Sequence, residues 1–315
     1  MIRELNMSKP LIVVIAGPTA SGKTGLSIEI AKKFDGEIVS ADSMQIYKSM
    51  DIATAKPTKE ETAEIRHHLI DFVDSGESFS VAKYKKLAYA AIDDILSRRK
   101  LPIVCGGTGL YIDTLIHNTV FLDYEKNGIR EKLENRKEAD GIEGLYEELK
   151  RVDPETAQKL HINDSKRIIR ALEIYYSTGK TISEQNNLSH NEESPYRFLL
   201  FVLDARDRDV LYQRINNRVD KMLEMGLVEE AKAFFNTDAS NTARQAIGYK
   251  ELKPYLDGEI SLESAVEKLK METRRYAKRQ LTWFRNKDHV IRLYIDDEKS
   301  VFEECAQVIS QYLGA

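Results

Sequence analysis

Over its first hundred residues, the chain alternates short apolar runs with longer stretches of mixed polarity. Leu11–Ala16 is a continuous aliphatic run, typical of a strand buried on both faces of a parallel sheet. Glu37–Ser40 and Leu101–Cys105 are shorter runs of the same kind. We expect helices in the stretch that ends at Lys33 and over Val81–Arg99. Strands separated by helices imply right-handed crossovers and a ligand site at the carboxyl ends of the strands.

The pattern changes between residues 118 and 195, where strand-like runs disappear and charged residues become frequent. Apolar residues there recur at helical spacing, as in Ile168, Leu172 and Tyr175. We therefore predict an inserted all-helical subdomain over residues 118–195. Its exit linker is expected at the polar segment 186–195.

The α/β domain is expected to resume after this insert. Tyr196–Asp204 is rich in aliphatic and aromatic residues and predicts another core strand. Two long amphipathic helices are expected near Val210–Phe235 and Leu262–Phe284, and we expect them to finish the chain. The prediction is thus an α/β core formed by residues 1–117 and 196–315, with helices at its C-terminus.

Length and composition narrow the class of protein. At roughly 150 residues per domain, a chain of 315 residues suggests two domains. Hydrophobic residues make up 42% and charged residues 31%, which fits a globular protein with a substantial core. Because the net charge is −4, the molecule as a whole does not attract nucleic acid, and any RNA contact needs local basic patches. Two cysteines are too few for a disulfide framework or a cysteine-rich zinc finger.

The sequence contains no sign of a membrane span or a secretory leader. The longest apolar run, Leu11–Ala16, is far shorter than the ~20 residues that a membrane helix needs. Residues 1–10 are polar and lack the apolar centre of a signal peptide. We expect a cytoplasmic protein without membrane contact. Met1 and Met7 are both candidate start residues.

The turn after the first strand carries a phosphate-binding motif. Residues 17–24 fit G-x-x-x-x-G-K-S/T without mismatch, with a strand before and a helix after. Backbone N–H groups and the positive end of the helix suit phosphate oxygens, Lys23 adds a mobile charge, and the Thr24 hydroxyl suits Mg²⁺. The alternative is a chance match in an ordinary strand–helix turn. The motif predicts a sheet of the P-loop NTPase type, with phosphate ligands drawn from Gly17, Pro18, Thr19, Ala20, Ser21, Gly22, Lys23 and Thr24.

A second Gly-Lys-Thr triplet occurs at Gly179–Thr181. The first glycine of a P-loop would here fall at Ile174, and no strand precedes it. We interpret Gly179 as a helix C-cap instead.

The acidic residue that usually accompanies a P-loop is displaced in this chain. An ATPase typically carries a carboxylate at the end of a second core strand to organise Mg²⁺ and water. Leu101–Cys105 is followed by Gly106, Gly107 and Thr108, whereas Asp42 follows the strand at Glu37–Ser40. Asp42 could hold magnesium through water or act as a general base, and the structural alternative is a helix N-cap.

Two basic clusters are candidates for contact with RNA phosphates. Lys166, Arg167 and Arg170 lie in the predicted insert, where a solvated helix face is the alternative. A second cluster near the C-terminus has aromatic residues interleaved, which either stack on bases or pack in the core. Its basic residues are Lys270, Arg274, Arg275, Lys278, Arg279, Arg285 and Lys287.

Six segments together resemble the tRNA dimethylallyltransferase family, also called the tRNA isopentenyltransferases. They are GPTASGKT (17–24), DSMQIYKSMDIATAKPT (42–58), GGTGLYIDTL (106–115), NDSKRIIRALEIYYSTGKT (163–181), QAIGYKE (245–251) and RRYAKRQLTWFR (274–285). The resemblance runs in order from about residue 10 to 290. The second and fifth segments are far more specific than the P-loop alone. The C-terminal zinc finger of eukaryotic members is absent, as the cysteine count requires, so the chain looks like a bacterial form.

This resemblance implies transfer of a dimethylallyl group from dimethylallyl diphosphate to the exocyclic N6 of an adenosine. That base is at tRNA position 37, next to the anticodon, in tRNAs that read codons beginning with U. Mg²⁺ assists, diphosphate leaves and no nucleotide is hydrolysed, although the P-loop motif alone is also typical of ATP binding. The expected partners are the anticodon stem-loop of tRNA and dimethylallyl diphosphate. We expect a monomer, for which the sequence itself holds no positive signal.

The resemblance also implies which residues form the site. Asp42 would accept the amine proton, Lys23 and Thr24 would complete the catalytic set with Mg²⁺ at Thr24, and Arg218 would bind the diphosphate. The tRNA contacts would come from Asp42, Ser43, Met44, Gln45, Thr108, Arg130, Lys166, Arg167, Ile168, Ile169, Arg170, Gln245, Gly248, Tyr249, Lys250, Arg279, Gln280, Trp283 and Arg285.

Two rival functions share parts of this pattern. A P-loop kinase for a nucleoside or metabolite would use the same motif and strand-terminal aspartate, and the predicted insert would serve as its lid. A non-catalytic RNA-binding module would bind tRNA and form no prenylated product. An assay of dimethylallyl incorporation into tRNA distinguishes the transferase from the kinase and from the RNA-binding module.

Overall fold

The computed structural model describes residues 9–124, 127–190, 193–287 and 289–314. Most of the N-terminal segment interpreted as lacking a leader, including both candidate start residues, lies outside the described residues. Contacts between Cα atoms divide the chain into two compact units: residues 1–114 with 195–315, and residues 115–194. The helical insert was predicted over residues 118–195. Among the described residues, no helix is long and apolar enough to cross a membrane.

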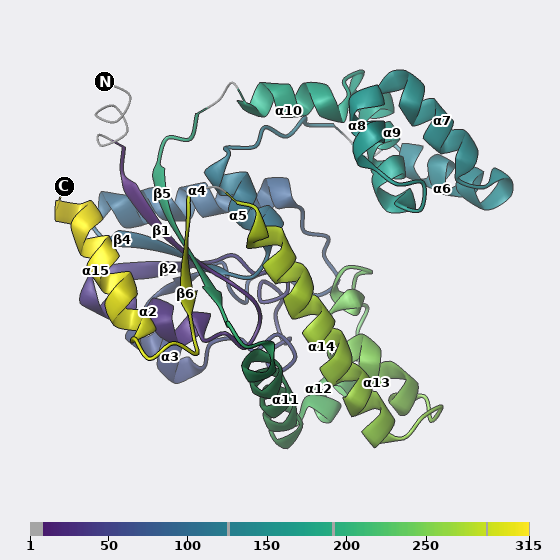
Figure 1. The fold of residues 1–315 in the computed structure, drawn as a ribbon. Coiled ribbons are helices and arrows are strands. Elements are labelled where there is room, and N and C mark those ends of the chain that lie inside the picture. The colour runs from purple at the N-terminus through teal and green to yellow at the C-terminus, as the bar shows by residue number, and fades with distance from the viewer. Residues whose placement is uncertain (1–8, 125–126, 191–192, 288, 315) are drawn as a thin grey trace. The chain divides into compact units, whose positions relative to one another are not determined.

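The first unit is built on one sheet of six parallel strands, in the order β3-β2-β4-β1-β5-β6 (Figure 1). The strands are β1 Leu11–Ala16, β2 Gly36–Ser40, β3 His67–His68, β4 Leu101–Gly106, β5 Arg197–Asp204 and β6 Val290–Tyr294. Every residue of β1 is buried, because β1 lies between β4 and β5 and has helices on both sides. The predicted α/β fold with a parallel sheet is confirmed.

Strand order decides which face each crossover helix covers. The chain moves from β1 to β2 in one direction along the sheet and returns from β2 to β4 in the other. Right-handed crossovers therefore place α2 (Lys23–Lys33) and α4 (Val81–Ser97) on opposite faces. The C-terminal helix α15 (Val301–Gly314) contacts α2, and residues of both helices share one core cluster with Val13 and Ile15 of β1.

A second core lies beyond the carboxyl edge of the sheet. It joins Tyr47 and Met50, which follow β2, to apolar residues of the C-terminal helices, among them Phe234 and Tyr249. This core therefore brings the loop after β2 against helices nearly 200 residues away in sequence. The remaining elements of the unit are α3 Lys59–Glu64, α5 Gly109–Ile116, α11 Arg208–Glu224, α12 Leu227–Phe235, the 3₁₀ helix η1 Ala243–Gln245, α13 Tyr249–Leu256 and α14 Leu262–Arg285.

The C-terminal region differs from its prediction in two ways. The single helix expected over Val210–Phe235 is two helices, because Gly226 adopts φ 97° and separates α11 from α12. The helix α14 does not finish the chain, since β6 and α15 follow it. The edge strand β6 was missed because it is short and only Leu293 in it is fully buried, which leaves a weak apolar pattern.

The second unit is a small bundle with its own core. Its helices are α6 Ile129–Asp140, α7 Glu143–Val152, α8 Pro154–Lys159, α9 Ser165–Thr178 and α10 Ile182–His190. Leu133, Leu149, Ile168 and Leu172 pack together at its centre. Gly179 takes the left-handed C-cap conformation with φ 70°, which confirms its assignment as the end of a helix. The predicted linker over 186–195 is wrong at its start, because α10 continues to residue 190; residues 191–192 lie outside the described ranges.

Candidate functional site

Three adjacent strands place the predicted motifs side by side. The P-loop follows β1, Asp42 follows β2, and the Gly106–Thr108 turn follows β4. These turns are also bonded to each other, since the Thr108 N–H donates to the Ala41 carbonyl. A cavity of about 310 Å³ opens at this edge, within the first unit. Its polar lining includes Thr19, Lys23, Thr24, Asp42, Ser43, Gln45, Cys105, Arg218, Lys250, Thr273, Tyr276, Arg279 and Gln280.

The P-loop needs its glycines for two different reasons. Gly17 adopts φ 144°, and a Cβ there would lie 2.7 Å from the Leu203 carbonyl oxygen. Gly22 adopts φ 92° at the start of α2, a conformation that side chains disfavour. Ser21 is buried and its hydroxyl donates to the Pro18 carbonyl at 2.8 Å. The loop is therefore a rigid turn beside the N-terminus of α2, as anion binding requires.

Lys23 carries a positive charge with little to balance it. Its Nζ donates to the Pro18 carbonyl at 2.5 Å. Burial lowers the pKa of Lys23 to about 8, with a smaller contribution in the same direction from Arg218 on α11. Burial also lowers the pKa of Arg218, and the nearby Asp42 carboxylate opposes that effect. Two enclosed cations face one carboxylate, which makes the cavity a receptor for an anion.

Asp42 has one carboxylate oxygen engaged and one available. Its Oδ1 accepts from the backbone N–H groups of Met44 at 2.8 Å and Gln45 at 3.3 Å. The residues after it form turns rather than a helix, so the N-cap alternative does not apply. Its Oδ2 accepts no hydrogen bond within the described part of the chain. Backbone donors thus orient the carboxylate while leaving an oxygen free to take a proton.

Thr108 and Tyr276 lie next to the segment that carries Asp42, and Tyr276 lines the cavity. Thr108 Oγ1 accepts from the Ser43 N–H at 3.0 Å, which ties the turn after β4 to the one after β2. The Tyr276 hydroxyl lies beside Thr108, and burial, reinforced by the Asp42 charge, raises its pKa above the usual range. Tyr276 was considered only as a packing or stacking aromatic, because an aromatic in a basic helix gives no sign that it lines a cavity.

The glycines of the turn after β4 make room for neighbouring segments. A Cβ on Gly106 would overlap the backbone of Ala41, and one on Gly107 would overlap the amide of Gln280. A Cβ on Gly109 would overlap the indole of Trp283. Because these positions have no side chain, the loop after β2 and the side chains of α14 approach the backbone here to van der Waals distance.

Gln280 connects the P-loop to this turn. Its Oε1 accepts from the Thr19 N–H at 2.9 Å, and its Nε2 donates to the Gly107 carbonyl at 3.0 Å. The side chain is buried, with 6% of its surface exposed. Both ends of the amide are used inside the protein, which gives Gln280 a positioning role, and its predicted tRNA contact stays a prediction.

Part of the cavity is apolar. Ile215, Val219 and Met222 of α11 line it together with Leu269 of α14 and Ala53 of the loop after β2. The α11 residues lie on the apolar face of the amphipathic helix that was predicted near Val210–Phe235. Helical periodicity identifies a buried face but does not distinguish core from cavity wall, so this part of the site could not be found from the pattern alone.

The other residues of the first unit that were predicted to contact tRNA line the cavity, lie on the surface or lie in the core. Gln245, Gly248 and Lys250 line the cavity, as does Arg279. Two further residues of α14 are exposed, Trp283 and Arg285. The Trp283 Nε1 donates to Asp113 at 2.8 Å, which fixes the exposed indole.

Tyr249 is fully buried, and its ring stacks on Phe234 with centroids 4.3 Å apart. The side chain therefore lies in the core of the first unit, and the predicted contact of Tyr249 with tRNA stays a prediction. The motif placed the residue correctly beside the cavity-lining Gly248 and Lys250, but a spacing pattern does not tell which member of a segment points inward.

The residues of the second unit that were predicted to contact tRNA fall into three groups. Ile168 and Ile169 are fully buried in the core of that unit, and their predicted contact with tRNA stays a prediction. Arg130 and Arg170 both bond to Glu173, at 3.3 and 3.1 Å, so their charges are partly balanced. Lys166 and Arg167 are exposed on α9.

Comparison with known proteins matches these features to one family. Residues 45–287 match the model of the IPP transferase family. The chain is 52% identical over 309 residues to the tRNA dimethylallyltransferase of Thermoanaerobacter sp. strain X514, covering 96% of this chain and 97% of that protein. It is 46% identical over 300 residues to the tRNA dimethylallyltransferase of Halalkalibacterium halodurans, covering 94% and 95% of the two chains.

Solved structures agree with this assignment. The chain resembles the full-length tRNA isopentenylpyrophosphate transferase of Bacillus halodurans with 44% identity, a TM-score of 0.72 and 97% coverage of both chains. It resembles a eukaryotic dimethylallyltransferase acting on tRNA with 33% identity and a TM-score of 0.83, over 97% of this chain and 80% of that one. The resemblance found in the sequence is thus confirmed, and the chain belongs to the IPP transferase family and is a transferase.

Proposed function

We propose that this transferase moves a dimethylallyl group from dimethylallyl diphosphate to the exocyclic N6 of adenosine 37 in tRNAs that read codons beginning with U. Transfer of a dimethylallyl group to tRNA is the activity that the family membership carries. The observation that supports the finer assignment is one cavity with three parts: a cationic phosphate cradle, an apolar wall and an oriented carboxylate. The proposal includes a cytoplasmic location.

The two substrates follow from these parts. The diphosphate would bind at the P-loop, where Lys23, Arg218 and the N-terminus of α2 supply positive charge. The five-carbon chain would contact Ile215, Val219 and Met222. The adenine would enter beside Asp42, which requires the base to leave its stack in the anticodon loop.

The reaction needs charge stabilisation at one end and proton removal at the other. The bond between the allylic carbon and the diphosphate oxygen breaks, and a bond from N6 to that carbon forms. Negative charge grows on the departing diphosphate, where Lys23 and Arg218 stabilise it. The N6 proton passes to the Oδ2 of Asp42, the carboxylate oxygen that holds no other hydrogen bond in the described chain.

The donor set fits Mg²⁺ only in combination with a phosphate compound. Within the described residues no group of three or more His, Cys, Asp or Glu could hold a metal. The Thr24 hydroxyl is an oxygen donor on the wall of the cavity, which suits a magnesium ion that keeps several waters. A bound Mg²⁺ would neutralise diphosphate charge there.

The second unit is proposed to contact the tRNA. Its exposed Lys166 and Arg167 lie on consecutive positions of α9 and offer charge to the phosphate backbone, Arg167 in addition to its own ion pair with Asp164 at 3.4 Å. Arg130 and Arg170 contribute less in this proposal, because Glu173 already balances them.

The function itself is tested by product analysis. We expect that the purified protein, unmodified tRNA, dimethylallyl diphosphate and Mg²⁺ yield N6-dimethylallyl adenosine, detected by mass spectrometry of the digested tRNA. ATP in place of dimethylallyl diphosphate should give no product. Phosphate transfer from ATP to a nucleoside or metabolite would instead support a kinase, and tRNA binding without any prenylated nucleoside would support a non-catalytic module.

We predict that Asp42→Asn lowers kcat by about 10²–10⁴ with a smaller change in KM. Asparagine keeps the size of aspartate and an oxygen that accepts from Met44 and Gln45 but has no basic oxygen, so positioning survives while proton removal does not. Single-turnover rates with saturating substrates measure the effect. A near-normal rate would contradict the role as a base, and partial rescue by added Mg²⁺ would indicate a magnesium ligand instead.

We predict that reversing the two exposed charges of α9, Lys166→Glu with Arg167→Glu, weakens tRNA binding and flattens its salt dependence. Each lost phosphate contact should reduce the slope of log K against log salt by about 0.7–0.9. The matched control, Lys150→Glu with Lys159→Glu, makes the same change of net charge on α7 and α8 of the same unit. Equal affinity of both variants for tRNA would remove α9 from the RNA interface.

A further inference from the structure

The loop after β2 forms one side of the cavity. Residues 42–45 begin it, and Ala53, Thr54 and Ala55 return to line the same cavity before α3 starts. Between them, Thr54 Oγ1 donates to the Met50 carbonyl and the Ala55 N–H donates to the Ile52 carbonyl at 2.9 Å. Segment 50–56 is therefore a tight coil, which has to be held in place against the rest of the molecule.

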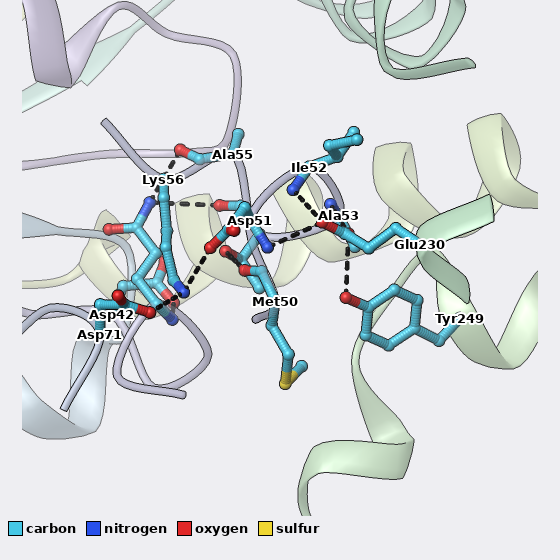
Figure 2. A network of polar contacts seen from close by, with 12 residues as sticks. Asp42, Met50, Asp51, Ile52, Ala53, Ala55, Lys56, Asp71, Glu230 and Tyr249 are labelled. Carbon is cyan, nitrogen blue, oxygen red and sulfur yellow. Dashed lines mark hydrogen bonds and ion pairs between the residues drawn. The ribbon is translucent and has the colours of Figure 1, made fainter. Parts of the chain in front are cut away.

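A single carboxylate holds this coil from the C-terminal region. Glu230 on α12 accepts three consecutive backbone N–H groups: Asp51 at 2.9 Å and Ile52 at 2.7 Å on Oε2, and Ala53 at 2.9 Å on Oε1. Its Oε1 also accepts from the Tyr249 hydroxyl at 2.9 Å. Figure 2 shows the carboxylate between the coil and the tyrosine.

The chemistry of these four contacts requires a carboxylate. All four partners are donors, and an ionised carboxylate is the side chain that only accepts, on two oxygens. A glutamine at this position would turn its NH₂ group toward at least one of the N–H groups and lose the charge that strengthens the rest. The buried position of Tyr249 fixes the tyrosine end of the arrangement.

The coil is in turn bonded to the residues beside the reacting atoms. Gln45 Nε2 donates to the carbonyls of Thr54 at 3.1 Å and Ala55 at 3.0 Å. The Gln45 N–H donates to Asp42 Oδ1. A continuous series of hydrogen bonds therefore runs from Glu230 through the coil and Gln45 to the proposed base.

A second contact anchors the other side of the coil. Lys56 Nζ lies 2.6 Å from both Asp51 and Asp71, and its side chain is 6% exposed (Figure 2). This anchor comes from neighbouring parts of the same loop region, whereas Glu230 supplies a polar contact to the C-terminal helices, beside the apolar packing of Met50 on the same helices. Loss of Glu230 should therefore loosen the cavity wall without unfolding the loop.

We propose that Glu230 is a positioning residue for the transfer reaction, fixing segment 50–56 so that Gln45 and Asp42 meet the acceptor adenine in the correct orientation. The inference rests on the proposed function, because it takes the Asp42 side of the cavity as the place of the adenine. The P-loop has no bond to this series among the described contacts, so the role concerns the tRNA substrate and not the diphosphate.

The test is a comparison of both substrates in Glu230→Gln. We expect KM for tRNA to rise, so that kcat/KM for tRNA falls by about tenfold or more, while KM for dimethylallyl diphosphate changes by less than about twofold. A merely structural role would lower the amount of folded enzyme, which reduces kcat and leaves both KM values unchanged. The matched control is Glu229→Gln, the same change at an exposed neighbouring position of α12, which should behave as the wild type.

Tyr249→Phe provides a milder second variant. It removes one of the four donors and keeps the buried ring, so it should lower kcat/KM for tRNA in the same selective way but less. Thermal unfolding of each variant shows whether it is folded. If Glu230→Gln does not fold, a Tyr249→Phe enzyme with wild-type kinetics overturns the proposal.

Other outcomes are equally decisive. A Glu230→Gln enzyme with wild-type kcat/KM for tRNA, or with equal rises in both KM values, contradicts the positioning role. Failure of the wild-type enzyme to prenylate tRNA in the same assay contradicts the proposed function itself, so the two failures are distinguishable.

Discussion

The arrangement of the site depends on one buried amide. Gln280 joins the Thr19 N–H of the P-loop to the Gly107 carbonyl of the turn after β4, and it comes from a helix 261 residues further along the chain than Thr19. The first of these turns is the proposed place of the phosphate compound. The second is bonded to the segment that carries Asp42, so the two turns must be held at a fixed separation. Gly107 has no side chain because the amide occupies that space. The parallel sheet brings the turns to one edge, and Gln280 fixes their distance.

The cavity contains two buried positive charges, on Lys23 and Arg218, which are unfavourable when no anion is bound. Burial lowers the pKa of Lys23 to about 8, and it also lowers the pKa of Arg218, so both cations are more stable when an anion is present. The one carboxylate nearby, Asp42, has an oxygen held by two backbone N–H groups. The site is therefore incomplete by itself, and the diphosphate that we propose as its substrate would supply the missing negative charge. Binding of that substrate should also stabilise the fold.

Sequence patterns identified the parts of this site that are local. The strand at Leu11–Ala16, the P-loop and the acidic residue after β2 follow from residue type and spacing, because each is built from consecutive residues. The break at Gly226 was missed because a glycine within an amphipathic pattern does not show its backbone angle. Ile168 and Ile169 were assigned to RNA with their basic neighbours, although their position on α9 turns them into the core.

The long-range contacts gave no signal in the sequence. Glu230 is an ordinary acidic residue of an amphipathic helix until the fold brings it to Asp51, and nothing in its neighbourhood predicts three N–H donors. The family resemblance assigned Gln280 to tRNA, whereas its buried position depends on Gly107, 173 residues away. Contacts of this kind follow from strand order and helix packing rather than from local pattern.

The most direct test of this account is the catalytic efficiency of Gln280→Leu with dimethylallyl diphosphate. Leucine fills the same space but cannot bond to Thr19 or Gly107, so kcat/KM for the diphosphate substrate should fall by about 10–10²-fold while the protein stays folded. Thr282→Ala on the exposed side of the same helix is the control and should leave the value unchanged. A Gln280→Leu enzyme with wild-type kcat/KM would contradict the claim that this amide holds the site together.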